Sequence, residues 1–173
     1  MTGSLLLWGG LALAIFWCVG LYNRLMRIRA RGFDALGSVE KHLKAYAMAV
    51  HVHLSDLKPM PQGWQQLLDT LSALDSAFKA ARATPLAIGP LELLAKQLES
   101  VQQAWSNLCD VPGDLAGPAV PPALEQAWEE ATLKIQRARG GYNQIIARYN
   151  EAIGQFPARL IVGVMGFQPA GTL

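Results

Sequence analysis

The apolar positions of this chain recur at helical spacing along most of its length. From residue 25 onward they follow steps of three and four, which place them on one face of a helix. Three stripes of this kind consist of Leu25, Ile28, Gly32, Leu36, Val39, Leu43, Tyr46, Val50 and Leu57; Trp64, Leu67, Leu68, Leu71, Leu74, Phe78 and Ala81; and Leu91, Leu94, Leu98, Val101, Trp105 and Leu108. No segment shows the alternation typical of a strand, so we expect an all-α protein.

A fourth stripe is the most regular of all. Its members are Leu124, Trp128, Ala131, Ile135, Ala138, Tyr142, Ile145, Tyr149, Ala152 and Phe156. This heptad spacing is typical of a long helix that packs along its whole length. Prolines separate the stripes at Pro59 and Pro61, at Pro85 and Pro90, and in the loop CDVPGDLAGPAVPP from Cys109 to Pro122.

Helix lengths predict the architecture. The segments 24–57 and 123–156 hold 34 residues each and would be about 50 Å long, whereas the two helices between them would be about 30 Å long. Short connections favour antiparallel neighbours, so we expect an antiparallel up-and-down helical bundle of two long and two short helices. The short helices should end near the level of Gly37, Gly140 and Gly141, where we expect a bend or a close helix contact.

The chain begins with an apolar segment. Residues 1–23 carry no charged side chain, and Leu5 to Leu21 alone would be about 26 Å long, close to the roughly 30 Å of a bilayer core. A cleaved secretory signal is the alternative, but it would place basic residues before the apolar run. We therefore predict a single-pass transmembrane anchor at 1–23, a helical bundle at 24–157 and an apolar tail at 158–173 that returns to the membrane surface.

Basic residues predict the orientation of that anchor. Arg24, Arg27, Arg29 and Arg31 follow the apolar segment directly, and positive flanks stay on the cytoplasmic side. We expect the chain in the cell (inner) membrane, with its N-terminus outside and its bundle in the cytoplasm. Beyond these arginines acidic residues slightly outnumber basic ones, so we expect no nucleic-acid partner. Cys18 and Cys109 are too far apart in this arrangement for a disulfide.

Candidate catalytic chemistry is sparse. His51 and His53 are two residues apart and point to different helix faces, and His42 would be about 16 Å from His53. We therefore expect no catalytic residue, no metal and no cofactor. An enzyme or metal-dependent regulator that uses His42, His51 and His53, with Asp56, is the alternative of a different class.

The sequence Tyr-Asn occurs three times, and an apolar tail follows the last of them. Tyr142 and Tyr149 occupy equivalent heptad positions, and each phenol needs a hydrogen-bond partner if it is buried. The tail could dock on lipid or a partner, or fold back on the first long helix. The candidate interaction residues are Tyr22, Asn23, Tyr142, Asn143, Tyr149, Asn150, Phe156, Pro157, Leu160, Ile161 and Phe167.

Two segments resemble the LemA family of bacterial membrane proteins. They are LYNRLMRIR at 21–29, after the apolar segment, and YNQIIARYNEAIGQFPARLIVGVMGF at 142–167, which contains the Phe-Pro and Leu-Ile-x-Gly-x-x-Gly-Phe pattern of that family. Residues 45–54 depart from the family pattern. The resemblance implies an antiparallel helical bundle on one membrane anchor. It implies no established reaction, and for some members a link to membrane remodelling, organelle assembly or neighbouring proteases.

Together these features favour a non-enzymatic, membrane-anchored helical scaffold. We expect its membrane-proximal seam and its tail to bind another membrane protein or a second copy of the chain. Direct membrane shaping by insertion of the tail into the headgroup layer is an alternative. Membrane lipid is an expected partner in either case.

Overall fold

The computed structural model describes residues 2–54, 62–111 and 120–173, and every regular element in these ranges is helical. The elements are α1 (Thr2–Leu54), α2 (Gln62–Ala83), α3 (Ile88–Cys109), α4 (Pro122–Gly154) and a 3-10 turn, η1 (Ala158–Leu160). The all-α prediction, with two long and two short helices, is confirmed. The expected first-helix end at Leu57, the prolines Pro59 and Pro61, and most of the proline-rich loop lie outside the described residues.

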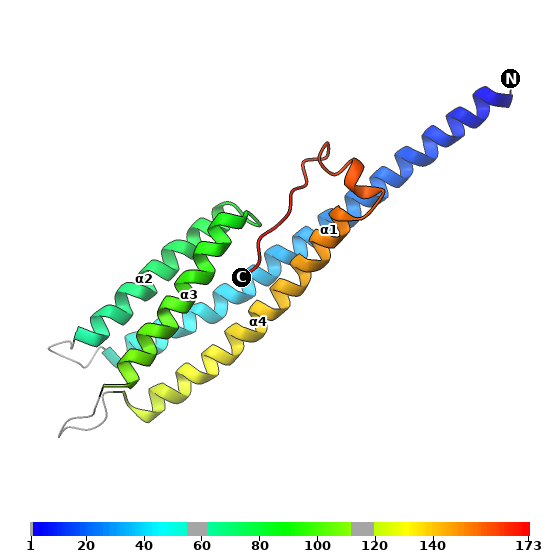
Figure 1. Ribbon diagram of the computed structural model, residues 1–173. Helices are drawn as coiled ribbons and strands as arrows, with labels where there is room; N and C mark the ends of the chain where they lie inside the picture. Colours follow the sequence, from blue (N-terminus) through cyan, green and yellow to red (C-terminus); the bar gives the residue numbers. More distant parts are fainter. Residues whose placement is uncertain (1, 55–61, 112–119) are drawn as a thin grey trace.

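The helices form two layers (Figure 1). One layer is the long pair, in which α4 runs antiparallel to α1, and the other is the α2/α3 hairpin, which lies along the half of that pair farthest from the N-terminus. The four apolar stripes meet between the layers, where residues such as Leu43, Leu67, Leu98 and Ile135 are buried. The sequence stripes therefore identify most of the core correctly.

Stacked aromatic rings join the layers near the far end of the bundle. The Trp128 ring on α4 stacks on Trp105 of α3, with centroids 4.1 Å apart, and on Tyr46 of α1, with centroids 4.0 Å apart. The buried Tyr46 hydroxyl shares a 2.7 Å hydrogen bond with the Thr132 hydroxyl. Three helices thus meet on one tryptophan, and the polar atom of the Tyr46 side chain has a hydrogen-bond partner.

The structure corrects three details of the fourth stripe. Helix α4 ends at Gly154 rather than at Phe156, and the Phe156 side chain is 73% exposed. Ile146, not Ile145, is the fully buried isoleucine of that turn. The predicted fourth stripe is one step too long, because Pro157 disfavours helical geometry at Phe156, the residue before it.

The predicted close helix contact at Gly37, Gly140 and Gly141 is wrong. A Cβ added at Gly37, Gly140 or Gly141 would have no atom within 4 Å beyond the local helix. Gly32 is the α1 glycine at a helix contact, because a Cβ there would lie 3.5 Å from Ile146 on α4 and 3.5 Å from Leu86 in the α2–α3 turn. The short helices therefore reach nearer the N-terminal end than we expected from their lengths.

The first part of α1 extends alone beyond the bundle (Figure 1). Large apolar side chains on all sides of it are exposed, namely Leu6, Leu7, Trp8, Leu11, Leu13, Ile15, Phe16, Trp17 and Val19. This stretch is long and apolar enough to cross a membrane, with a window of mean hydropathy 1.6 that is only 6% buried. By length and composition it is a candidate membrane span, as the sequence predicts.

Candidate functional site

The C-terminal tail folds back on its own chain. After α4 the C-terminal turn, residues 156–166, includes η1 and ends at Gly166, which has a positive φ of 76°. Residues 167–173 then run in an extended path back along α4, antiparallel to it, and end beside the middle of the bundle (Figure 1). Of the alternatives that the sequence left open, folding back is the one seen here, but the hydrogen bonds of the tail go to α4 rather than to the first long helix, α1, which it meets through the Phe167 ring.

Two asparagines on α4 hold the main chain of this extended tail. Asn150 donates from Nδ2 to the Ala170 carbonyl at 2.9 Å, and its Oδ1 accepts the Ala170 N–H at 2.8 Å. Asn143 makes the same pair of bonds with Leu173, at 2.7 Å and 2.8 Å. Each amide side chain therefore satisfies one donor and one acceptor of a single tail residue, as a neighbouring strand would.

The two tyrosines complete the set. Tyr149 donates from its hydroxyl to the Gln168 carbonyl at 2.9 Å, and Tyr142 donates to the Gly171 carbonyl at 3.2 Å. Burial raises the pKa of Tyr142 to about 12 and also raises the pKa of Tyr149, which the nearby Arg29 charge partly offsets. Both phenols therefore stay neutral donors at physiological pH. We call Tyr142, Asn143, Tyr149 and Asn150 the tail clamp.

The seven-residue repeat of the clamp matches the repeat of an extended chain. Seven helical residues advance about 10.5 Å, and three extended residues advance about 10 Å. In the structure a step from Asn143 to Asn150 corresponds to a step from Leu173 to Ala170. The same three-residue step separates the acceptors of the two tyrosines. The Tyr-Asn repeat is therefore spaced to bind the backbone of an extended segment.

The end of the tail meets the α2–α3 turn. The Gly171 N–H donates to the Leu86 carbonyl at 3.1 Å, and a Cβ at position 171 would lie 2.9 Å from the Ile88 Cα, so only glycine fits there. Leu86 is buried and has a positive φ of 73°, a conformation that costs a non-glycine residue about 1 kcal/mol or more. The hydrogen bond from Gly171 of the tail and the packing beside Gly32 of α1 surround Leu86 in this conformation.

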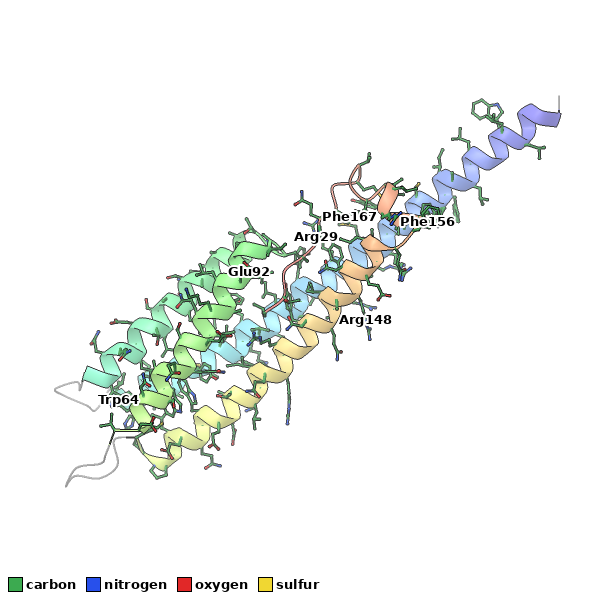
Figure 2. All side chains as sticks on the ribbon, viewed as in Figure 1. Arg29, Trp64, Glu92, Arg148, Phe156 and Phe167 are labelled. Carbon is green, nitrogen blue, oxygen red and sulfur yellow. The ribbon has the colours of Figure 1, made fainter. Side chains whose placement is uncertain are left out.

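The C-terminal turn lies beside α1, close to where its apolar part ends. Phe167 is buried and its ring meets Tyr22 edge-on, with centroids 5.7 Å apart. Phe156, Leu160 and Val164 point outward instead and are 73%, 64% and 92% exposed, while Pro157 is exposed and Ile161 is half-buried. Figure 2 shows Phe156 and Phe167 at the end of α4 nearest the N-terminal part of α1. This end of the body therefore carries an exposed apolar patch.

The remaining predicted residues lie on α1, where the Arg29 charge is close to Tyr149 of the clamp. The Asn23 side chain is exposed, and its carbonyl accepts a 3.3 Å bond from Arg27. Arg29 lies over the Phe33 ring, with 5.6 Å from its guanidinium carbon to the ring centroid. Arg24, Arg27 and Arg31 are exposed on another face of α1.

The histidines do not form a common site among the described residues. His53 is half-buried against Trp64, with ring centroids 5.2 Å apart, whereas His51 is exposed. His42 is half-buried about three turns away. Within the described ranges no group of three or more histidine, cysteine or carboxylate side chains could hold a metal ion. Asp56 lies outside these ranges.

Comparison with protein families bears on the segment that contains the clamp and the tail. Residues 114–173 match the model of the LemA family. The predicted resemblance to the LemA family is confirmed over this segment. The matched LemA segment covers about a third of the chain, and the resemblance at 21–29 lies outside it and stays a prediction. The searches of curated proteins and of solved structures found no match.

The sequence identified the clamp residues but not what they hold. It predicted that each buried phenol needs a partner, and the structure supplies that partner from the tail. The sequence did not single out Arg148 on α4, because only the packing of α4 beside α1 brings it to the arginines of α1. Whether any of these residues also meets a second protein stays a prediction.

Proposed function

We propose that this LemA family chain is a non-enzymatic, single-pass membrane scaffold that holds a rigid helical body against the cytoplasmic face of the cell membrane. The observation that carries this proposal is the exposed apolar patch of Phe156, Leu160 and Val164 beside the apolar part of α1. A large exposed apolar patch is typical of a surface that meets lipid or another protein. One end of the molecule would therefore be embedded, and the other would project into the cytoplasm.

The patch is also the surface that we propose binds a membrane-protein partner. The sequence predicts that role for the membrane-proximal seam between the long helices and for the tail, but the tail occupies the seam with paired hydrogen bonds. A partner at the seam would have to displace those bonds. Binding through the outward-facing side chains of the C-terminal turn requires no such displacement.

A second candidate is membrane shaping by the same turn. Val164 is 92% exposed, which favours insertion of the turn into the headgroup layer. The two candidates differ in what touches position 164. A photo-crosslinker at Val164 should form a protein adduct in native membranes if the chain is a scaffold, and lipid adducts alone if it shapes membranes. The matched control is Leu133, an exposed apolar residue in the half of α4 far from the C-terminal turn, which should form neither.

The native cysteines test the anchor and its orientation. Cys109 is exposed at the end of α3, and Cys18 lies in the apolar part of α1. Burial and the charges of Glu125 and Asp110 raise the pKa of the Cys109 thiol, so it should react more slowly than an ordinary exposed thiol at the same pH. A membrane-impermeant maleimide should label Cys109 only after the cells are opened, and Cys109→Ser should abolish the label. Labelling in intact cells, or extraction by alkaline carbonate, would overturn the proposal.

A further inference from the structure

A polar hollow lies between α1 and α4, on the side of α4 away from the tail. It has a volume of about 370 Å³ and is lined by Arg24, Arg27, Ile28, Arg31, Ile145, Arg148, Glu151, Ala152 and Gln155. Figure 2 shows Arg148 on α4, below the C-terminal turn. We call this hollow the arginine pocket.

The charges in this pocket are not balanced within the described chain. Arg24, Arg27 and Arg31 share one face of α1 because they are three and four residues apart, and Arg148 meets them from α4. Glu151 is the one carboxylate of the lining. The ion pairs between described residues, at Glu40, Asp75 and Glu130, involve none of the four arginines. Gathering like charges raises their energy, so the pocket favours an anion.

Guanidinium groups favour one kind of anion in particular. Their planar donors match the oxygens of a phosphate group, and they can bind it through two parallel hydrogen bonds. The pocket volume also lies within the range of small-molecule sites. A phosphate ester therefore fits the chemistry of this pocket.

A second hollow continues from the pocket toward the N-terminus. It has a volume of about 820 Å³ and shares Arg24, Ala152 and Gln155 with the arginine pocket. The rest of its lining is Gly10, Leu13, Ala14, Phe16, Trp17, Gly20, Leu21, Phe156, Pro157 and Ala158. Gly10 and Gly20 have open space where a side chain would stand. We call this hollow the apolar groove.

We infer that the arginine pocket and the apolar groove together bind one anionic phospholipid. Its phosphate would lie among the arginines, and an acyl chain would follow α1 past Gly20 and Gly10. The inference rests on the proposed function, because the groove faces hydrocarbon only if α1 spans a membrane. The positions agree with this, since Arg24 and Arg27 would lie about 5 and 9 Å beyond Leu21, at and just below headgroup depth.

The test uses the full chain in detergent and counts bound lipid by native mass spectrometry. The probes are phosphatidylglycerol, phosphatidylcholine and soluble glycerol phosphate. The wild-type protein should retain phosphatidylglycerol in preference to phosphatidylcholine. Arg148→Gln should weaken phosphatidylglycerol binding about fivefold. Arg137→Gln removes the same charge from α4 outside the pocket and should change binding less than twofold. Gly20→Leu should fill the groove and weaken binding while leaving all arginines in place.

Each contrary result has a distinct meaning. Equal retention of the two lipids, or an equal loss in Arg148→Gln and Arg137→Gln, would overturn the site. Glycerol phosphate that binds as tightly as phosphatidylglycerol would show that the ligand is a free phosphate ester, and would overturn the lipid assignment. If alkaline carbonate extracts the protein from native membranes, the proposed function fails. If the protein stays in the membrane without headgroup preference, only the site fails.

Discussion

The seam between the long helices α1 and α4 is covered in two different ways along its length. Over the half far from the N-terminus the α2/α3 hairpin covers it with apolar side chains such as Leu67 and Leu98. Over the half nearer the apolar part of α1 the extended tail covers it, held by the clamp. The same pair of helices therefore supports two kinds of packing.

The two covering segments differ in where their backbone N–H and C=O groups find hydrogen-bond partners. A helix bonds its own N–H and C=O groups, so it needs only apolar partners. An extended segment has no internal bonds, and unpaired backbone groups at a packed surface are costly. The tail therefore needs side chains that both donate and accept, which Asn143 and Asn150 provide. This explains why the α4 Tyr-Asn pairs occur only on the half of α4 that the tail covers.

The largest effect should come from the helix-covered half. Trp128→Ala removes the ring that stacks on both Trp105 and Tyr46. We expect the helical body to lose about 3–5 kcal/mol of unfolding free energy, as for other buried large-to-small changes. Urea unfolding followed by circular dichroism measures this loss. A loss below about 1 kcal/mol would show that the ring stack does not hold the layers together.

The next largest effect should be local to the tail. Asn150→Ala removes both bonds to Ala170 and leaves its N–H and C=O without their side-chain partner. We expect tail docking to weaken by about 2 kcal/mol, which corresponds to about 30-fold faster hydrogen exchange at the Ala170 amide. Protection in α2 and α3 should not change, because their backbone bonds are internal.

The matched control for this change is Asn23→Ala. Asn23 also follows a tyrosine, but its side chain is exposed and lies outside the clamp. Exchange at Ala170 should stay within twofold of wild type. If both variants released the tail equally, the clamp geometry would not explain the Tyr-Asn pairs on α4.

A smaller effect at neutral pH, and a larger one in alkali, is expected at Tyr142. Its pKa is raised to about 12 when folded, against about 10 in an unfolded chain. The neutral phenol therefore contributes stability that is fully present below pH 10 and is lost as the pH rises toward 12. Tyr142→Phe should weaken docking by about 1 kcal/mol at pH 7 by removing one hydrogen bond. It should also flatten the loss of docking between pH 10 and 12.

Fluorescence anisotropy of a dye on Thr172→Cys, in a background with both Cys18→Ser and Cys109→Ser, reports tail docking across this pH range. Thr172 is exposed, so the dye need not disturb the clamp. Tyr46→Phe is the control, since Tyr46 is also buried with a raised pKa but lies in the helix-covered half. An alkaline transition that is unchanged in Tyr142→Phe would contradict the assignment.

The sequence predicts the helical half of this arrangement better than the half that the tail covers. Helical periodicity gave the four helices, their antiparallel order and most of the core, because each stripe is a local pattern. The sequence left the position of the tail open. The bonds between the tail backbone and Asn143 and Asn150 depend on the direction of the chain after Gly166, and not on a repeat in the tail itself. The arginine pocket needs α1 and α4 side by side, so Arg148 could not be grouped with Arg27 before that pairing was known.

The smallest effect concerns the boundary between the two covers. Gly140 lies on α4 just before the clamp begins, and a Cβ there would meet open space. If the change of cover needs no bend in α4, Gly140→Ala should stabilise the body by about 0.5–1 kcal/mol, because alanine has the higher helix propensity. Gly171→Ala is the matched contrast, since its Cβ would lie 2.9 Å from the Ile88 Cα and should expel the tail. A destabilised Gly140→Ala would show that α4 bends there, and that the two covers require different helix geometry as well as different side chains.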